Sequence, residues 1–304
     1  MVNFYRKRRT FFVDIIFLNR NEKNMDQKTF DDFFKPYAQN VDKADSVSAF
    51  WRLSDALIME IIKENIGKFC TENSLVCDAG GGTGRWVVKI GRELPGKLMV
   101  YDRSTDMLAR AKENIEKAGL IKRVTLVQGD LIDMKNIENE SIDHIVSIYS
   151  PISFIYEGGK AASEMFRVLK RGGRILLMGH SYYNALASKV NNYRAGSEEI
   201  VRLAKDYRVK WAPHVPELVT FSKESMEALL SATGFRIEKT YGVPVFVQPG
   251  PEDFDPENEK VSAVSRYLEN PDVFKEIFDL EMEHNSKDTV ANRGMNIFTL
   301  ATKI

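Results

Sequence analysis

The chain has 304 residues, of which 43% are hydrophobic and 28% are charged, the balance of a globular protein. Its 43 basic residues are matched by 43 acidic ones, so no global charge draws it to nucleic acid or to an anionic membrane. No stretch of the sequence is long and apolar enough to cross a bilayer. The length suits one large α/β domain with insertions, or a domain with a small cap.

The first 24 residues differ in character from the rest of the chain. Basic residues 6–9 precede a mostly apolar run, 11–18, which a single acid interrupts. This order loosely mimics a secretory signal, but the run is short and charged, and no small-residue cleavage site follows it. We therefore expect residues 1–24 to be a frayed extension, with Met25 as the working start of a domain that spans residues 25–304.

The two cysteines, Cys70 and Cys77, are close in sequence but do not form a Cys-x-x-Cys pair. This spacing suggests neither a disulfide framework nor a zinc site. Cys77 lies in an apolar run, so we expect it to be buried as a small hydrophobic residue. A reducing environment is the natural setting for such a chain, and we expect it to be cytoplasmic.

Helical patterns dominate residues 30–66, and from Leu75 onward short apolar runs alternate with helical stretches. That alternation indicates a parallel sheet covered by helices. The strands that we predict are 75–78, 98–102, 124–128, 144–149, 174–178, 240–248 and 296–303. The helices that we predict between them include 105–118, 161–169 with Gly172-Gly173 as its stop, and one that Ser222 caps.

Two stretches interrupt this alternation. Residues 181–219 follow the fifth strand, and residues 249–294 lie between the last two strands. The second stretch opens as a proline-rich loop and turns helical around 261–268 and 271–283. We interpret both as helical cap insertions that cover one end of the sheet.

The most informative run is 76–86, Val-Cys-Asp-Ala-Gly-Gly-Gly-Thr-Gly-Arg-Trp, which a strand enters and a helix leaves. Its spaced glycines let the backbone turn tightly and approach a ligand closely, while the helix start presents unpaired N–H groups. The dinucleotide fingerprint GxGxxG fails here, because the position of its third glycine is Arg85 in one register and Val87 in the other. The run is not a Walker loop either, since no Gly-Lys-Ser/Thr follows.

At this point the chain resembles the class I S-adenosylmethionine-dependent methyltransferases, whose first motif is an acid followed by spaced glycines, here Asp-x-Gly-x-Gly-x-Gly at 78–84. Further matches follow in family order. Asp102 ends the second strand, Gly-Asp-Leu at 129–131 follows the third, and residues 143–149 resemble the fourth. Residues 169–177 resemble the turn into the fifth strand and the strand itself. The two insertions are not covered by any of these motifs.

The resemblance implies a Rossmann-like fold, in which a seven-stranded, mostly parallel sheet ends in an antiparallel strand and carries helices on both faces. It implies S-adenosyl-L-methionine as the cofactor. Asp102 would hold both ribose hydroxyls in a bidentate hydrogen bond, and Asp130 would face the adenine amino group. The residues assigned to the cofactor in this way are Asp78, Gly80, Gly82, Gly84, Asp102, Arg103, Met107, Gly129, Asp130, Leu131 and Tyr149.

The acceptor side is encoded less clearly. Histidines 144, 180, 214 and 284 have no metal-ligand spacing, so we expect no metal. His180 follows the fifth strand, where substrates bind in open α/β folds, and it is either the catalytic candidate or a locally bonded loop histidine. The run Ser-Pro-Ile-Ser at 150–153 departs from the Asn/Asp-Pro-Pro-aromatic motif of enzymes that methylate exocyclic base amines, which argues against such acceptors.

Aromatic residues before the glycine motif have two interpretations. Phe33, Phe34, Tyr37, Trp51 and Arg52 either pack on the helices or form a lid, with Arg52 pairing the carboxylate of the cofactor. Packing is the better interpretation of the two phenylalanines, and the other three stay open. We expect the two insertions to supply an apolar pocket over the methyl donor, with walls that include Tyr182, Tyr183, Trp211 and Phe246.

The favoured hypothesis is a methyltransferase that acts on a small molecule by direct displacement at the sulfonium methyl group. Zero net charge and two large insertions favour this acceptor class over nucleic acid. Two alternatives stay open: a methyltransferase that modifies RNA or protein, and a protein that binds S-adenosylmethionine without transferring the methyl group. The sequence indicates neither the accepting atom nor an oligomeric state.

Overall fold

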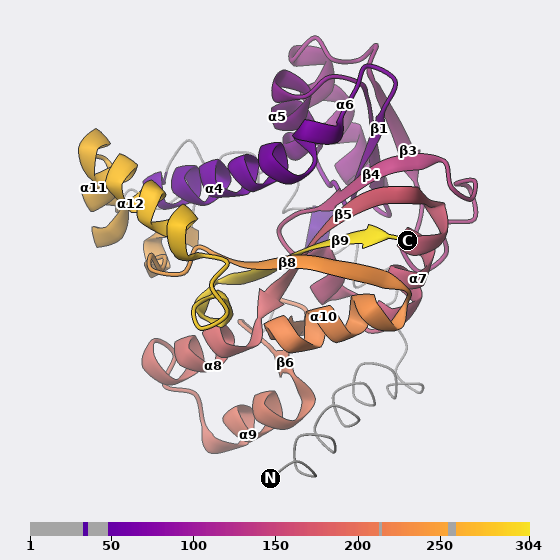
Figure 1. The fold of residues 1–304 in the computed structure, drawn as a ribbon. Coiled ribbons are helices and arrows are strands. Elements are labelled where there is room, and N and C mark those ends of the chain that lie inside the picture. The colour runs from indigo at the N-terminus through magenta and orange to yellow at the C-terminus, as the bar shows by residue number, and fades with distance from the viewer. Residues whose placement is uncertain (1–32, 36–47, 213–214, 255–259) are drawn as a thin grey trace.

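A computed structural model describes residues 33–35, 48–212, 215–254 and 260–304 (Figure 1). The expected extension, residues 1–24, and Tyr37 lie outside these described residues. Within them, the structure contains no helix that is both long and apolar enough to span a membrane.

One mixed sheet lies at the centre of the molecule (Figure 1). Its strands are β1 (Leu75–Ala79), β2 (Lys97–Asp102), β3 (Val124–Gln128), β4 (Ile142–Ser147), β5 (Leu169–Ser181), β6 (Arg208–Val209), β7 (Leu218–Phe221), β8 (Phe235–Val243) and β9 (Asn296–Lys303). Strands β3, β2, β1, β4 and β5 pair in this order and are all parallel. Strand β9 pairs with β5 and with β8, antiparallel to both. The predicted Rossmann-like sheet with an antiparallel last strand is confirmed.

Two short strands join the seven that the sequence predicts. Strand β7 pairs with the last two residues of β5, His180 and Ser181, and β6 pairs with β7. At His180 the other edge of β5 is taken by β9, so β7 occupies the edge along which β4 has already ended. This arrangement extends β5 beyond its neighbour β4, and it carries His180 past the point where β4 stops.

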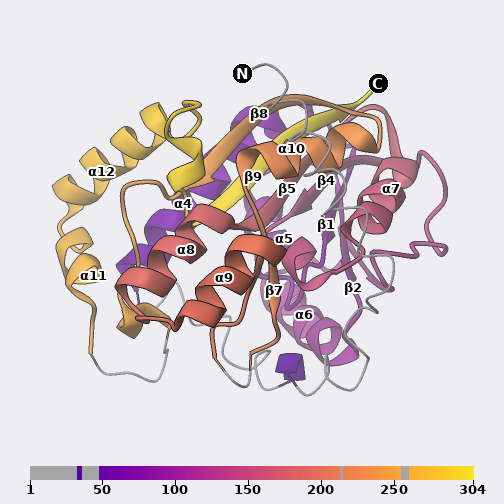
Figure 2. The same ribbon diagram turned by 90° about the horizontal axis from the view of Figure 1, so that it is seen from below.

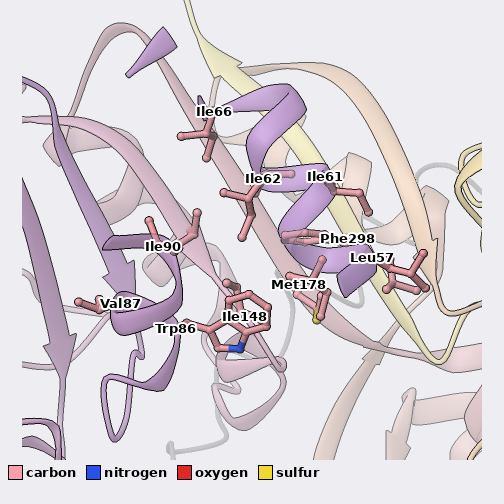
Figure 3. Packing of buried hydrophobic residues seen from close by; sticks show 14 of the residues in the cluster. Leu57, Ile61, Ile62, Ile66, Trp86, Val87, Ile90, Ile148, Met178 and Phe298 are labelled. Carbon is pink, nitrogen blue, oxygen red and sulfur yellow. The ribbon is translucent and has the colours of Figure 1, made fainter. Parts of the chain in front are cut away.

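Helices cover both faces of the sheet. Helices α4 (Ala49–Asn65), α5 (Arg85–Glu93) and α6 (Thr105–Lys117) pack on one face, and α7 (Gly158–Val168) and α10 (Lys223–Ala232) pack on the other. Helix α4 starts at the N-cap Ser48, whose side chain accepts a hydrogen bond from the Trp51 N–H. Apolar residues recur along α4 at helical spacing, and Figure 3 shows Leu57, Ile61 and Ile62 beside Phe298 and Met178.

Several element boundaries differ from the prediction. Strand β8 starts at Phe235 instead of residue 240 and ends at Val243, before the cis proline Pro244, which has no N–H to donate to a neighbouring strand. Strand β5 already begins at Leu169, so Gly172-Gly173 lies within this strand and does not stop α7. Strand β4 ends at Ser147 because the backbone turns left-handed at Tyr149.

The two stretches outside the alternation form separate groups of short elements. The first contains α8 (Tyr182–Asn191), α9 (Ser197–Asp206), β6 and the start of β7, and α8 and α9 pack together (Figure 2). The second contains α11 (Ala263–Leu268) and α12 (Pro271–His284), and both pack on α4. The remaining short 3-10 helices are η2 (Gly67–Phe69), η3 (Pro151–Phe154), η4 (Pro251–Phe254) and η5 (Ala291–Arg293).

A buried carboxylate fixes the segment that follows β8. Glu281 of α12 is 0% exposed, and its two oxygens accept hydrogen bonds from the N–H groups of Val245, Phe246 and Val247 at 2.7–3.1 Å. These N–H groups lie beyond the end of the sheet and would otherwise lack acceptors in a buried environment. Glu281 therefore takes the place of a neighbouring strand for these three residues.

Replacing Glu281 with alanine should lower the free energy of unfolding by about 2–4 kcal/mol, because it leaves buried N–H donors without an acceptor. Urea unfolding followed by circular dichroism measures this loss. Glu283→Ala is the matched control: its side chain is 66% exposed and lies near His284, on the same helix, and Lys287, just beyond it. The control should change the free energy by less than about 0.5 kcal/mol, and equal losses in the two variants would contradict the role of Glu281.

Candidate functional site

The glycine loop between β1 and α5 is the first component of the site. Gly80, Gly82 and Gly84 all have positive φ angles, 76°, 52° and 69°, which other residues adopt only with strain. A side chain on Gly80 would collide with Pro151, because its Cβ would lie 2.5 Å from the proline Cβ. A Cβ on Gly82 would approach only the sulfur of Met107, at 3.7 Å. Gly80 is therefore required for packing, whereas Gly82 leaves open space beside the loop.

Asp102, the last residue of β2, connects the second strand to this loop. Its Oδ2 accepts a hydrogen bond from the Gly82 N–H at 2.8 Å, and its Oδ1 accepts one from the Ser104 N–H at 2.8 Å. The residue is 8% exposed, and burial raises the pKa of its carboxyl group while these N–H groups oppose the shift. A carboxylate has about four lone-pair sites, so Asp102 can still accept a further hydrogen bond from a hydroxyl group.

Asp78 lies beneath the loop at the carboxyl end of β1. It is 2% exposed, and its Oδ2 has no hydrogen-bond partner among the described residues. Burial, followed by the nearby charge of Asp102, raises the pKa of the Asp78 carboxyl group to about 8. A cationic group placed beside this carboxylate would stabilise its charged form, so the site is suited to a positively charged ligand.

The third strand brings its predicted residues to the same sheet edge. The Gly129 N–H donates to the Asp102 carbonyl at 3.0 Å, and Asp130 Oδ1 accepts from the Ile132 N–H at 3.1 Å. Arg103 lies 3.7 Å from Asp130 Oδ2. Packing alone favours glycine at position 129, since an added Cβ would lie 1.9 Å from the Tyr101 hydroxyl. The carboxyl ends of β1, β2 and β3 thus gather the predicted cofactor residues around one edge.

Tyr149 occupies a strained turn after β4. It and Ser150 have positive φ angles of 57° and 67°, and such strain in non-glycine residues is concentrated at functional sites. The ring of Tyr149 lies edge-on to that of Trp51, with centroids 5.7 Å apart. Its hydroxyl donates to Asp55 Oδ1 of α4 at 2.5 Å, and burial together with Asp55 raises the pKa of Tyr149 well above its usual value.

Asp55 is a functional candidate that the sequence analysis missed. Besides Tyr149, its carboxylate contacts the guanidinium of Arg85 and, at 3.1 Å, the ammonium of Lys89, both on α5. A signal was present in the sequence, because Asp55 interrupts the apolar side of the amphipathic run that forms α4. Asp55 therefore joins α4, α5 and the turn after β4 at one buried point.

The possible lid residues separate into two groups. Phe33 and Phe34 contact Phe154 of η3, with ring centroids 6.1 and 5.2 Å apart, as the packing interpretation expects. Arg52 pairs with Glu269 at 2.6 Å on an exposed part of α4. The Trp51 indole N–H donates at 2.6 Å to a backbone carbonyl of η4, in the second inserted stretch.

His180 lies at the carboxyl end of β5. The backbone N–H of His180 donates to Ser153 Oγ at 2.9 Å. The imidazole ring lies edge-on to the ring of Trp211, with centroids 5.3 Å apart. Its Nε2 is buried without a hydrogen-bond partner among the residues that the structure describes. Burial lowers the pKa of the imidazole to about 4, so His180 is neutral near pH 7.

Of the four predicted pocket-wall residues, Tyr182 and Trp211 pack against the same small cluster, and the ring of Tyr183 lies 5.1 Å from that of Tyr182. Trp211 lies beside His180, and Tyr182 packs on Tyr207 in the first inserted stretch. Tyr183 is 47% exposed, and Phe246 is 44% exposed with its ring against His284. Among the four, Trp211 is the residue that the structure places next to a predicted site residue.

Comparisons with known proteins agree with this arrangement. Residues 76–173 match the model of a methyltransferase domain family. The Salmonella ubiquinone/menaquinone biosynthesis C-methyltransferase UbiE is 33% identical over 108 residues, which are 35% of this chain. The match spans 42% of the length of that relative.

Solved structures show the same fold over most of the chain. The YcgJ protein of Bacillus subtilis superposes with a TM-score of 0.51 at 18% identity, covering 82% of this chain and 98% of that one. A chain from the complex of the Haloferax volcanii Trm112 methyltransferase activator gives a TM-score of 0.55 at 14% identity, covering 88% and 96%. The [4+2]-cyclase SpnF gives 0.50 at 17% identity, covering 83% and 80%.

The conclusion rests on the ordered motifs, the strand order and the domain match together. The acidic residue and spaced glycines stand at the end of β1, and the expected acids follow at the ends of β2 and β3. The matched domain, residues 76–173, runs from β1 through β4 and ends within the first residues of β5. Residues 76–173 therefore form a methyltransferase domain of the class I S-adenosylmethionine-dependent type.

Proposed function

We propose that this chain binds S-adenosylmethionine at the carboxyl ends of β1, β2 and β3 and transfers its methyl group to a small molecule. The observation that carries the proposal is the pairing of Gly82 with Asp102 above a buried carboxylate, Asp78, whose Oδ2 lacks a hydrogen-bond partner among the described residues. When bound, the cofactor supplies a methyl group that is already activated by a positively charged sulfur.

The residues at this edge fit the cofactor in three respects. The open space beside Gly82 admits a ligand against the backbone. The carboxylate of Asp102 suits the ribose hydroxyls, and the carboxylate of Asp130 suits the adenine amino group. Asp78 offers a buried partner for the positive charge of the cofactor.

Two features support a small acceptor. The first inserted stretch begins at the carboxyl end of β5, which is where ligands bind in open α/β sheets. The second inserted stretch reaches the site through the hydrogen bond from Trp51, whose ring contacts Tyr149. His180, which contacts Ser153 and Trp211, is the candidate for the residue that binds the methyl acceptor.

The alternatives differ in the acceptor or in the reaction. An RNA or protein methyltransferase needs an open approach for a large substrate. A binding protein without methyl transfer is the other possibility, and the likeness to a [4+2]-cyclase illustrates that this fold also carries other reactions.

An assay with methyl-labelled cofactor would separate these functions. The full chain would be incubated with fractionated small metabolites, with RNA and with protein from the source cells. The proposal expects label in a small-molecule fraction. Label in RNA or protein would favour the first alternative, and cofactor binding without any labelled product would favour the second.

Replacing Asp102 with alanine should weaken S-adenosylmethionine binding by about 1.5–3 kcal/mol, the scale of hydrogen bonds to a charged group. Isothermal calorimetry measures this change. Asp106→Ala, an exposed acid in the first turn of α6, is the matched control and should keep the affinity. Unchanged affinity in the Asp102 variant, with a normal melting temperature, would refute the site assignment.

Gly82→Leu should abolish cofactor binding by filling the space beside the loop, and should cost only about 1–2 kcal/mol of stability from its left-handed backbone. Gly119→Leu is the control, because Gly119 also has a positive φ, 72°, and a Cβ there would meet nothing within 4 Å. Calorimetry and thermal unfolding are measured on both. Similar losses of stability with loss of affinity only in the Gly82 variant support the proposal, and retained binding in that variant contradicts it.

Cofactor binding should release protons through Asp78. In the free protein its pKa of about 8 keeps the carboxyl group mostly protonated at pH 7, and a bound cation lowers that pKa. The affinity should therefore rise with pH up to about 8 and then level off. Calorimetry at pH 7 in buffers of different ionisation enthalpy counts the protons.

Asp78→Asn removes this titration and is the control for protons lost from the cofactor itself. The wild type should release close to one proton more than the variant at pH 7. Equal proton release by the two proteins would show that Asp78 does not pair with the bound cofactor.

A further inference from the structure

One buried nitrogen at the end of β5 has no role in the proposed cofactor site. His180 Nε2 is shielded from solvent and has no hydrogen-bond partner among the described residues. A buried polar atom without a partner costs about 1–3 kcal/mol, so a ligand that supplies the missing hydrogen bond regains this free energy. The backbone of His180 pairs with β7 on one side and with β9 on the other. The nitrogen without a partner therefore belongs to a residue that the sheet holds in place.

The position of His180 suits the acceptor side of the site. Strand β5 is two strands away from β1, with β4 between them. Neighbouring strands lie about 4.8 Å apart, so the ends of β1 and β5 are separated by about 10 Å. That distance lets a cofactor bound over β1 and an acceptor bound over β5 meet above the end of β4.

The surroundings of His180 are aromatic. The Trp211 ring meets the imidazole edge-on, with an interplanar angle of 84°, and Tyr193 packs on Trp211 with centroids 5.4 Å apart. Tyr182 and Phe154 pack against the same small core as Trp211. An apolar molecule is therefore the kind of ligand that these walls would accommodate.

The buried cations nearby already contact carboxylates. Lys189 is 4% exposed, and its ammonium contacts Glu199 and the Lys210 carbonyl, both at 2.5 Å. Arg208 is 8% exposed and lies 3.7 Å from Glu217. Because both charges are compensated, this part of the protein does not favour an anionic ligand such as a phosphate.

We propose, resting on the proposed function, that His180 Nε2 accepts a hydrogen bond from an O–H or N–H group of an uncharged, apolar methyl acceptor. Trp211 covers this nitrogen until the acceptor replaces it. His180 then determines specificity, because it binds the donor group of the acceptor and orients the molecule. The neutral imidazole is suited to this role, since one of its ring nitrogens carries a free lone pair.

Three small probes of similar shape test the proposal on the full chain with S-adenosylhomocysteine added. Phenol offers an uncharged O–H group, toluene lacks it, and benzoate is an anion. Dissociation constants from ligand-observed NMR should favour phenol over toluene by about fivefold to tenfold, the value of one hydrogen bond. Benzoate should bind most weakly. Equal binding of phenol and toluene, tighter binding of benzoate, or no binding of any probe would overturn the proposal.

His180→Phe keeps an aromatic ring and removes the nitrogen, so it should abolish the preference for phenol. His284→Phe, on α12, is the matched control and should keep the preference. A preference that persists in the His180 variant would overturn the proposal. Calorimetry with S-adenosylmethionine tests the proposed function separately, and both variants should bind the cofactor like the wild type. Loss of cofactor binding by the wild type would refute the proposed function.

The covering role of Trp211 has its own measurement, which does not depend on how well the His180 variant folds. Diethylpyrocarbonate modifies accessible histidine nitrogens, and mass spectrometry locates the modified residue. Trp211→Ala should increase the modification rate of His180 at least tenfold, while the rate at His284, whose side chain is 29% exposed, stays constant as an internal reference. Equal rates at His180 in the wild type and the variant would show that Trp211 does not cover the nitrogen.

Discussion

The hydrogen bond from the Gly82 N–H to the Asp102 carboxylate is the interaction on which the site depends. It joins the loop after β1 to the end of β2, and the second carboxylate oxygen fixes the start of α6 through the Ser104 N–H. One side chain thus sets the distance between two strand ends and the direction of the helix that follows. The left-handed backbone at Gly82 favours glycine, and the absence of a side chain leaves open space beside the loop. Asp78 beneath them is buried, and its Oδ2 has no donor within the part of the chain that the structure describes. This burial is the main reason for the raised pKa of its carboxyl group.

A second carboxylate organises the opposite side of the site. Asp55 contacts Arg85 and Lys89 on α5 and the hydroxyl of Tyr149, so it holds the strained turn after β4 against α4. A left-handed tyrosine persists only where its surroundings compensate the strain, and here the compensation is one short hydrogen bond and an aromatic contact with Trp51. The turn keeps the end of β4 away from the end of β5, and β7 takes the edge of β5 that becomes vacant. The strained turn therefore lies between the ends of β1 and β5.

The sequence predicts the fold well, and it identifies the acids and glycines at the ends of β1, β2 and β3, because those signals are local. Spaced glycines, an acid at each strand end and alternating apolar runs are read within windows of about ten residues. The boundaries that were wrong depend on longer-range effects: β5 starts at Leu169 because β4 is there to pair with it. Asp55 and Glu281 were missed for the same reason, since the groups that they bind lie tens of residues away in the chain. Of the four aromatic residues predicted to share one pocket wall, Tyr182 and Trp211 pack against the same small cluster. Phe246 is exposed and packs on His284, which the periodicity of the sequence does not reveal.

The attachment of α4 to the second inserted stretch has a consequence during synthesis on the ribosome. Ser48, at the start of α4, hydrogen-bonds to Asp253 and to Ser265, which are 205 and 217 residues further along the chain. Both partners are buried, so the contact forms only when the late segment has been made. At translation rates of about 5–20 residues per second, the start of α4 emerges about 10–40 s before its partners. During this interval the surface of α4 that α11 and α12 later cover lacks these partners.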